Sequence, residues 1–281
     1  MDVTQVLDEE KTNRFQQLIG ILRWAIELGR VDILTEVSCL SQHLAEPREE
    51  HLIAVFKIFK YLNQHLKISN RRIVFNGKSM VIDSAIINDF NRDEWMDFYS
   101  DAREELPVRI PEPLGNPVQV IAYVDANHAG NIKTRTSHSG VLIYINQAPI
   151  IWYNKRQNTV EASSFGSEYI ALRICTEMVE ALRYKLRCFG VPVEGPADVL
   201  CDNRSVVTNS SVPTSVLNKR HNAICLHRVK EAQAAGIIRV GWIEGTKNVV
   251  DLFITTTLSN ESKRIFTHFI FDDVFTPLAK T

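Results

Sequence analysis

The chain has 281 residues, of which 45% are hydrophobic, and its 32 Lys and Arg nearly balance 33 Asp and Glu, giving a formal net charge of −1. This length suggests one or two domains with a packed core. The charge balance excludes a strongly basic DNA-coating protein but not a local basic groove. No apolar run approaches the roughly 20 residues of a membrane span. The five cysteines form no C-x-x-C pair, which favours a reducing compartment. We therefore expect an intracellular protein, cytoplasmic or nuclear, with no membrane partner.

Residues 1–69 are expected to be a small helical segment. In QQLIGILRWAIELGRVDI, apolar residues recur at helical spacing, for example at Leu18, Leu22 and Ile26. A second helix is predicted over 31–45, ahead of Pro47, and a third over 48–66, where apolar residues again form one stripe. These helices are expected to form a bundle or a lid on a second domain.

Residues 70–117 are expected to connect that segment to a second domain. RRIVFNG predicts a short strand and turn, and the acidic stretch that follows ends with Pro107, Pro111, Pro113 and Pro117. Trp95 and Tyr99 are expected to pack this surface connection against a neighbouring element.

Residues 118–281 are expected to form a mixed α/β domain. VQVIAYVDA, GVLIYIN and PIIWYN predict a three-strand antiparallel meander, followed by a helix over about 164–189 that Gly190 ends. A short strand, ADVLCD, leads into a helix limited by Pro213, and a further helix is predicted over 219–235. IIRVGWIE predicts a fifth strand, and 248–271 begins as a helix. This order implies a mixed sheet covered by helices.

Four carboxylates stand at the ends of these elements. Asp125 and Asp202 end strands, whereas Glu168 and Asp251 open helices. Each has a structural alternative: a turn for Asp125, a helix cap for Asp202, and support of a helix dipole for Glu168 and Asp251. The combination favours one shared site, because four clustered carboxylates need a cation to offset their repulsion. Two divalent ions roughly 4 Å apart would supply it for phosphoryl transfer.

Five motifs in order carry a resemblance to a known family. YVDANHAG, KTRTSHSGVLIYINQAPIIWYNKRQNTVEASSFGSEYIAL, VLCDNRSVV, LNKRHNAICLHRVKEA and NVVDLF resemble the RNase H domain of Ty/copia-type retrotransposon Pol polyproteins. Residues 15–66 look like the end of the family's reverse transcriptase. The resemblance implies an RNase H-like mixed five-stranded sheet flanked by helices and preceded by the small helical segment.

The resemblance also implies a reaction. Asp125, Glu168, Asp202 and Asp251 match the family's catalytic, metal-binding acids, which coordinate two Mg²⁺, with Mn²⁺ as an alternative, and hydrolyse the RNA strand of an RNA–DNA hybrid. The hybrid and the rest of a Pol polyprotein are the implied partners. Many relatives carry a further acid where this chain has Gly166, so Glu168 is the one candidate in its motif.

The chain departs from the family's pattern at the last acid. Val250 replaces a common Ala, and Ile254 and Thr255 stand where the family usually has Thr and Lys. The polymerase's Tyr-x-Asp-Asp hairpin has no counterpart, so polymerase activity is not expected. A start at Met without fingers or palm fits a gene fragment or relic. The alternatives to a nuclease are thus a catalytically degenerate relic that at most binds nucleic acid, and an integrase or resolvase of the same fold acting on duplex DNA.

Substrate contact is predicted at the end of the third strand. Lys155, Arg156, Gln157 and Asn158 directly precede the Glu168 helix and are candidates for phosphate and sugar contact, as is Asn203 beside Asp202. The alternative for the cluster is a solvated turn.

The histidines are given no catalytic role. His221 and His227 have Cys225 as the one nearby thiol, which argues against zinc and for structural or phosphate-facing roles. The loop before Asp251, EGTKNVV, contains no histidine, so no general-base histidine is assigned and water activation is left to metal.

Overall fold

A computed structural model describes residues 4–65, 78–87, 91–131, 134–217 and 220–254 of the chain. The described residues divide into two compact units, a helical unit within residues 4–65 and an α/β unit within residues 78–254. The expected strand over 71–77 and the end of the helix expected over 248–271 lie outside the described residues.

The helical unit contains α1 (Glu9–Glu27), α2 (Leu34–Leu40) and α3 (Glu49–Gln64). Asp8 caps α1, since its Oδ1 accepts a hydrogen bond of 2.8 Å from the backbone N–H of Lys11. The buried stripe of α1 consists of Phe15, Ile19, Leu22 and Ile26. The three helices predicted from apolar spacing are therefore confirmed.

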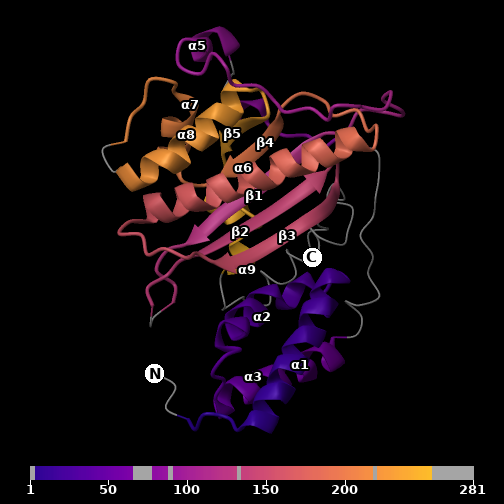
Figure 1. The fold of residues 1–281 in the computed structure, drawn as a ribbon, viewed down its shortest axis with the longest axis vertical. Coiled ribbons are helices and arrows are strands. Elements are labelled where there is room, and N and C mark those ends of the chain that lie inside the picture. Colours follow the sequence, from indigo (N-terminus) through magenta and orange to yellow (C-terminus); the bar gives the residue numbers. More distant parts are fainter. Residues whose placement is uncertain (1–3, 66–77, 88–90, 132–133, 218–219, 255–281) are drawn as a thin grey trace, which may run out of the picture. The chain divides into compact units, whose positions relative to one another are not determined.

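A five-stranded sheet forms the centre of the α/β unit (Figure 1). Its strands are β1 (Val120–Asn127), β2 (His138–Ile145), β3 (Ala148–Arg156), β4 (Ala197–Cys201) and β5 (Ile238–Trp242). Their order is β3-β2-β1-β4-β5. The first three strands form the predicted antiparallel meander, whereas β4 runs parallel to β1 and β5 parallel to β4.

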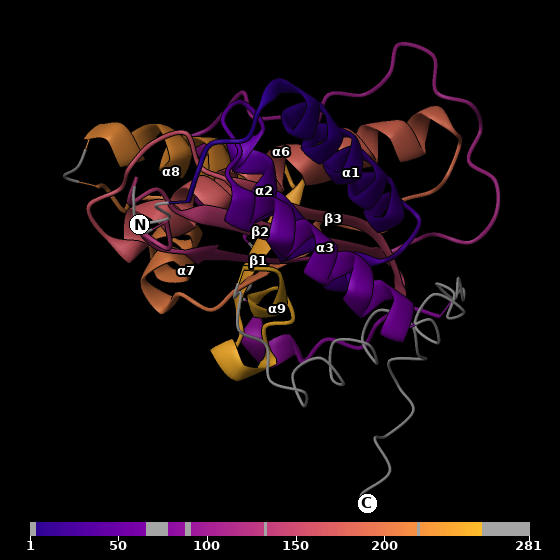
Figure 2. The same ribbon diagram turned by 90° about the horizontal axis from the view of Figure 1, so that it is seen from below.

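Helices cover both faces of this sheet. The long α6 (Ser164–Cys188) packs on β1 and β2 and beside α8 (Arg220–Ala234), with α7 (Arg204–Ser211) between β4 and α8 in the chain. The short α9 (Asp251–Ile254) contacts β1, β2 and β3 from the opposite face (Figure 2). The main apolar core, with Val124, Leu172 and Val199 among its members, lies between the sheet and α6. The mixed five-stranded sheet flanked by helices that the sequence predicts is therefore confirmed.

Residues 92–117, which belong to the segment predicted to be a connection, are part of the α/β unit and pack against its helices. Trp95, in α5 (Arg92–Met96), is 3% exposed and packs against Ala102 and Ala234, and the Tyr99 hydroxyl lies 2.7 Å from Nδ1 of His227. The predicted packing of the two aromatic residues is therefore confirmed. Farther along, Glu104 accepts hydrogen bonds from two arginines of α6, Arg183 and Arg187.

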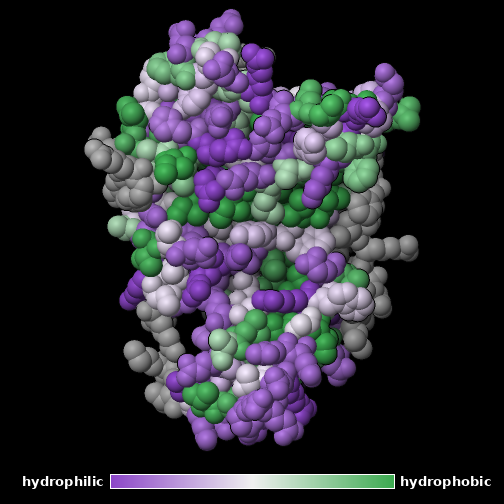
Figure 3. All heavy atoms as spheres, viewed as in Figure 1, coloured by the Kyte–Doolittle hydropathy of each residue, from purple (hydrophilic) through white to green (hydrophobic). Residues whose placement is uncertain are grey.

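The surface drawn in Figure 3 is mainly hydrophilic, with smaller hydrophobic patches between the polar side chains. Within the part of the chain that the structure describes, no helix combines the length and apolar character that crossing a bilayer requires.

Candidate metal centre

Asp125 and Asp202 are brought to the same edge of the sheet by the pairing of their strands. β1 and β4 are parallel neighbours, and Val124 pairs with Cys201. The two aspartates directly follow this pair, where the parallel pairing ends: Asp202 comes just after β4, and Asp125 is two residues before the end of β1. An open α/β sheet commonly places its ligand site at such ends.

Glu168 reaches this edge from the first turns of α6. Ser163 caps the helix through its hydroxyl, which accepts from the backbone N–H of Gly166. Gly166 keeps this turn narrow, because a Cβ there would lie 2.5 Å from Oε2 of Glu161. Glu168 and Asp125 are both 6% exposed, and Asp202 is half-buried.

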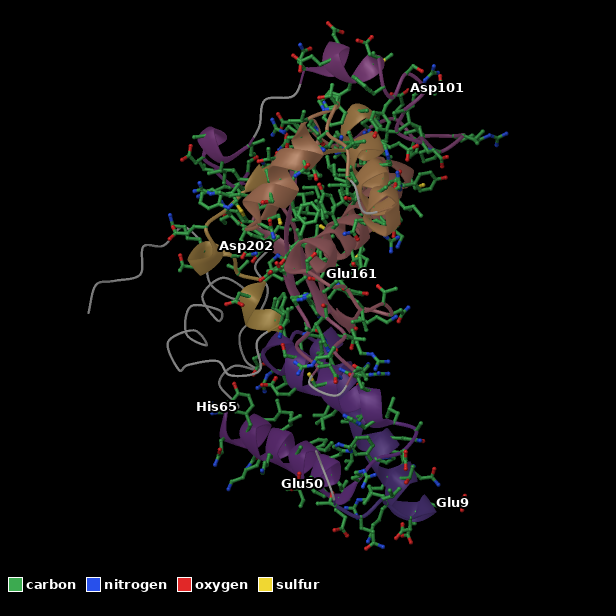
Figure 4. The ribbon with its side chains drawn as sticks, turned by 90° about the vertical axis from the view of Figure 1, so that its left-hand side faces the viewer. Glu9, Glu50, His65, Asp101, Glu161 and Asp202 are labelled. Carbon is green, nitrogen blue, oxygen red and sulfur yellow. The ribbon has the colours of Figure 1, made fainter. Side chains whose placement is uncertain are left out.

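Asp251 is the first residue of α9 and is exposed. Its backbone N–H donates to the carbonyl of Asn248, and the Asn248 side chain donates to the carbonyl of Val124 on β1, at 3.1 Å in each case. The charge of Asp251 acts on both Asp125 and Asp202. Asp202 and α9 lie at the same end of the unit (Figure 4). The structure thus brings all four predicted acids to one region.

The acids oppose one another's ionisation. Burial raises the pKa of Asp125 to about 7, and the charges of Asp202 and Asp251 add to this, against a 2.7 Å hydrogen bond from the N–H of Ala126. Burial, followed by the charges of Asp125 and Asp202, raises the pKa of Glu168 well above its usual value. Burial also raises the pKa of Asp202, with a further contribution from Asp251. A cation at this point would relieve all three effects.

One oxygen of the cluster is left unsatisfied. Oε2 of Glu168 is buried and has no hydrogen-bond partner. A buried acceptor without a partner is costly in a folded protein. Ligand atoms of Glu168, Cys201 and Asp202 all lie within 4.8 Å of one another. The orphaned oxygen and the mutual repulsion of the acids fit a divalent cation bound by this group.

Three asparagines, Asn127, Asn154 and Asn248, hold α9 and the residues before it against the sheet, and the sequence did not predict this role. Asn127 donates to the carbonyl of Ile254 at 2.9 Å, and Asn154 donates to the carbonyl of Phe253. Gly140, which pairs with both Asp125 and Asn154, leaves room for α9. The signal available in the sequence was the placement of amides at strand ends and of Asn248 just before Asp251.

The residues predicted to contact nucleic acid divide into two groups. Lys155, Arg156 and Asn158 are exposed at and beyond the end of β3. Together with Arg173 of α6 and Ile224 of α8 they line a surface hollow of about 370 Å³.

Gln157 and Asn203 instead make contacts within the domain. Gln157 is 3% exposed, and its amide donates to the Ser139 hydroxyl and to the carbonyl of Ser167, each at 2.9 Å. It therefore ties β2 to the first turn of α6. Asn203 caps α7 by accepting from the N–H of Val206 at 3.2 Å, which is the capping role weighed for the Asp-Asn pair from sequence. Substrate contact stays a prediction for both groups.

The histidines named from sequence lie on α8. His227 is exposed and hydrogen-bonded to Tyr99, a structural role. The side chain of His221 lies outside the described residues.

The chain is similar in sequence to transposon polyproteins. It is 24% identical over 252 residues to the retrovirus-related Pol polyprotein of transposon RE1 from Arabidopsis thaliana, covering 90% of this chain and 14% of the polyprotein. It is 23% identical over 257 residues to that of transposon TNT 1-94 from Nicotiana tabacum, covering 90% of this chain and 16% of the polyprotein. The chain thus spans less than a fifth of the length of these polyproteins. No protein-family model matches it.

Among solved structures, the N-terminal RNase H domain of a Mycobacterium tuberculosis protein is similar with a TM-score of 0.36 and 18% identity, covering 54% of this chain and 97% of that one. An RNase H1 isolated from compost gives a TM-score of 0.39 and 17% identity, covering 48% and 92%.

A shorter relative is matched over nearly its whole length. The secreted RxLR effector protein 161 of Plasmopara viticola is 36% identical over 169 residues, which are 60% of this chain and 91% of that protein. The chain is similar over 90% of its length to Pol polyproteins of copia-type retrotransposons, and it belongs to the same family as the Plasmopara viticola protein.

Proposed function

We propose that this protein is an RNase H-like nuclease that hydrolyses the RNA strand of RNA–DNA hybrids with divalent metal. The observation that carries the proposal is that carboxylate oxygens of Glu168 and Asp202 lie within 4.8 Å of each other, next to Asp125, whose charge acts on Glu168, and that Oε2 of Glu168 has no hydrogen-bond partner. The sequence shared with Pol polyproteins supports the substrate class.

In this proposal Asp125, Glu168, Asp202 and Asp251 hold two Mg²⁺, and Mn²⁺ can replace them. When bound, such ions supply a water activated for attack and offset the charge that develops on the leaving oxygen. Asp125 and Glu168 provide a rigid, buried base for the site, since their elements pack into the core. Asp251 lies exposed at the rim and completes the set from the opposite face of the sheet.

Substrate is proposed to reach the acids along the end of the sheet at which β1 and β3 both finish. β3 runs in the same direction as β1, and Asn154 of β3 is level with Asp125 through their common partner Gly140. Lys155 and Arg156 follow directly, so their backbone lies about 10 Å from that of Asp125, two strand spacings away. Basic groups at this distance can contact backbone phosphates, and polar groups such as Asn158 can contact the 2′-hydroxyls that mark RNA.

Cleavage of an end-labelled RNA–DNA hybrid with Mg²⁺ tests the proposal. Wild-type protein should cut the RNA strand and leave duplex DNA intact, and Asp202→Asn should abolish cutting. Asp101→Asn, which changes an exposed acid of the connection, is the matched control and should cut normally. Wild-type protein that cuts duplex DNA instead would favour an integrase or resolvase, and cutting that survives Asp202→Asn would contradict the site.

A second candidate function is hybrid binding without chemistry. One observation that favours it is Ile254, which stands where the resemblance leads one to expect Thr; its side chain is 5% exposed and lies against Gly140 of β2. Another is a relative that is named an effector rather than a polyprotein. Hybrid binding with no cleavage in either Mg²⁺ or Mn²⁺ would select this function.

A further inference from the structure

A thiol stands inside the group of acids, where the reaction proposed above gives it no task. Cys201 is the last residue of β4, fully buried and directly before Asp202. Its sulfur lies within 4.8 Å of a carboxylate oxygen of Glu168 and of one of Asp202, and these two oxygens also lie within 4.8 Å of each other. The three ligand atoms therefore form a compact triangle rather than a row.

The unsatisfied oxygen of Glu168 is an independent sign that this triangle can take a ligand. Glu168 is 6% exposed, and its Oε2 has no hydrogen-bond partner. Because protein groups leave this acceptor unpaired in a buried position, a cation placed there would gain an interaction without breaking a hydrogen bond at that oxygen.

The kind of cation follows from the donor atoms. Mg²⁺ takes oxygen ligands and keeps much of its water, and it has little affinity for sulfur. Zn²⁺ and Cd²⁺ accept thiolate together with carboxylate, and Zn²⁺ does so at about 2.3 Å from sulfur and 2.0–2.2 Å from oxygen. In a tetrahedral site such ligand atoms stand roughly 3.6 Å apart. The present ligand atoms lie within 4.8 Å of one another, so they must move closer together to hold the ion. The backbone of Cys201 is fixed in the sheet, and rotation of the Glu168 and Asp202 side chains toward it can bring the atoms to this spacing.

We propose that Glu168, Cys201 and Asp202 form a binding site for thiophilic divalent ions such as Zn²⁺ and Cd²⁺, overlapping the Mg²⁺ site and closing it. Burial and the nearby charge of Glu168 raise the pKa of the Cys201 thiol, so the ion itself must displace the proton. The metal–sulfur bond then forms as the S–H bond breaks, and the proton passes to the buffer. The ion occupies the oxygens of Glu168 and Asp202, so Mg²⁺ loses these ligands. Inhibition of cleavage by these ions rests on the proposed nuclease function, whereas binding of the ions to the protein does not.

Cd²⁺ titration of the full chain tests binding directly, because a cadmium–thiolate bond gives an ultraviolet charge-transfer band. All proteins carry Cys188→Ser, which removes an exposed thiol. The parent should develop the band at one ion per chain, and Cys201→Ser should lose it with a fall in Cd²⁺ affinity of at least about 10-fold. Cys175→Ser is the matched control, since Cys175 is also fully buried in the same apolar core but is not one of the residues whose ligand atoms meet there; it should keep the band. A band that survives Cys201→Ser would overturn the inference.

A second measurement needs no substitution at Cys201. ¹¹³Cd NMR of the parent protein with one bound ion should show a shift typical of one sulfur with oxygen ligands, and a shift typical of oxygen ligands alone would overturn the inference. This result stands even where Cys201→Ser unfolds the protein.

Cleavage with and without Cd²⁺ at constant Mg²⁺, compared within each protein, separates the two proposals. Cd²⁺ should inhibit the parent and inhibit Cys201→Ser much less. Mg²⁺-dependent cleavage without a cadmium–sulfur band would contradict the soft-metal site and leave the nuclease standing. A band without cleavage in Mg²⁺ would support the soft-metal site and contradict the nuclease.

Discussion

Asp125 is the residue at which burial and charge act most clearly in the same direction. It is 6% exposed, and burial and the nearby charges of Asp202 and Asp251 raise its pKa to about 7. An aspartate of an unfolded chain has a pKa near 3.9. Between these values the folded protein binds more protons than the unfolded protein, so the free energy of unfolding falls as pH rises through this window.

The metal-free protein should therefore lose stability from about pH 4 to pH 7, by a few kcal/mol in total. Mg²⁺ should restore most of the lost stability at pH 7, and it should add little stability at pH 4, where protons compete with it for the carboxylates. Asp125→Asn should flatten the pH dependence and reduce the Mg²⁺ effect. Thermal unfolding across this pH range, with and without Mg²⁺, measures both. Glu105→Gln, at an exposed position, is the control and should behave as wild type; a metal-free stability that does not fall as pH rises would contradict the electrostatic account.

At the scale of elements, the site depends on how closely α9 approaches β2. A Cβ added at Gly140 would lie 2.6 Å from Cγ1 of Val250 and 2.7 Å from Cγ2 of Ile254. Both side chains are buried, so neither can move aside into solvent. Glycine at this position therefore sets the distance between α9, with Asp251 at its start, and the strand that pairs with Asp125.

Gly140→Ala should lower the free energy of unfolding by about 1–3 kcal/mol, as overpacking does, and should weaken Mg²⁺ binding because Asp251 is pushed outward. Urea denaturation and calorimetric Mg²⁺ titration measure the two effects. Gly20→Ala, in α1 where a Cβ meets no atom within 4 Å, is the matched control; it should leave Mg²⁺ affinity unchanged. Normal Mg²⁺ affinity in Gly140→Ala would show that α9 does not position Asp251.

The sequence predicts the elements well because their signals are local. The alternation in β1 to β3, the apolar stripe of α6 and the end of α6 at Gly190 each lie within one segment. The approach of Gly140 to α9 and the inward turn of Gln157 depend on segments far apart in the chain. Periodicity carries no information on such contacts. The convergence of the four acids was predicted from their positions at element ends, whereas the place of Cys201 among them needed the packing of α6 on β4.

For the whole molecule, the main question is where the α/β unit begins. The prolines predict a connection up to residue 117, yet this segment supplies Glu104 to two arginines of α6. Arg183 is 2% exposed and donates to Glu104 at 2.7 Å and 3.1 Å, and Arg187 donates to it at 2.7 Å. Burial works to raise the pKa of Glu104, but the bonds from Arg183 and Arg187 outweigh it and hold the pKa below its usual value.

A fragment of residues 78–281 should therefore be more stable than one of residues 118–281, by at least about 2 kcal/mol, because the shorter chain loses the buried Trp95 as well as Glu104. The lowered pKa of Glu104 gives this difference a pH dependence. A carboxyl group whose pKa is lowered by folding stabilises the protein at pH values above its unfolded pKa, and this stabilisation is lost as pH falls through the folded pKa. The difference in the free energy of unfolding between the two fragments should therefore shrink below about pH 4. Urea denaturation of both fragments at pH 7 and pH 3 measures it. Equal stability of the two fragments at pH 7 would show that the folded unit begins at residue 118 and that residues 92–117 are a linker. A stability difference that is smaller at pH 3 than at pH 7 would show that Glu104 and its two arginines stabilise the fold.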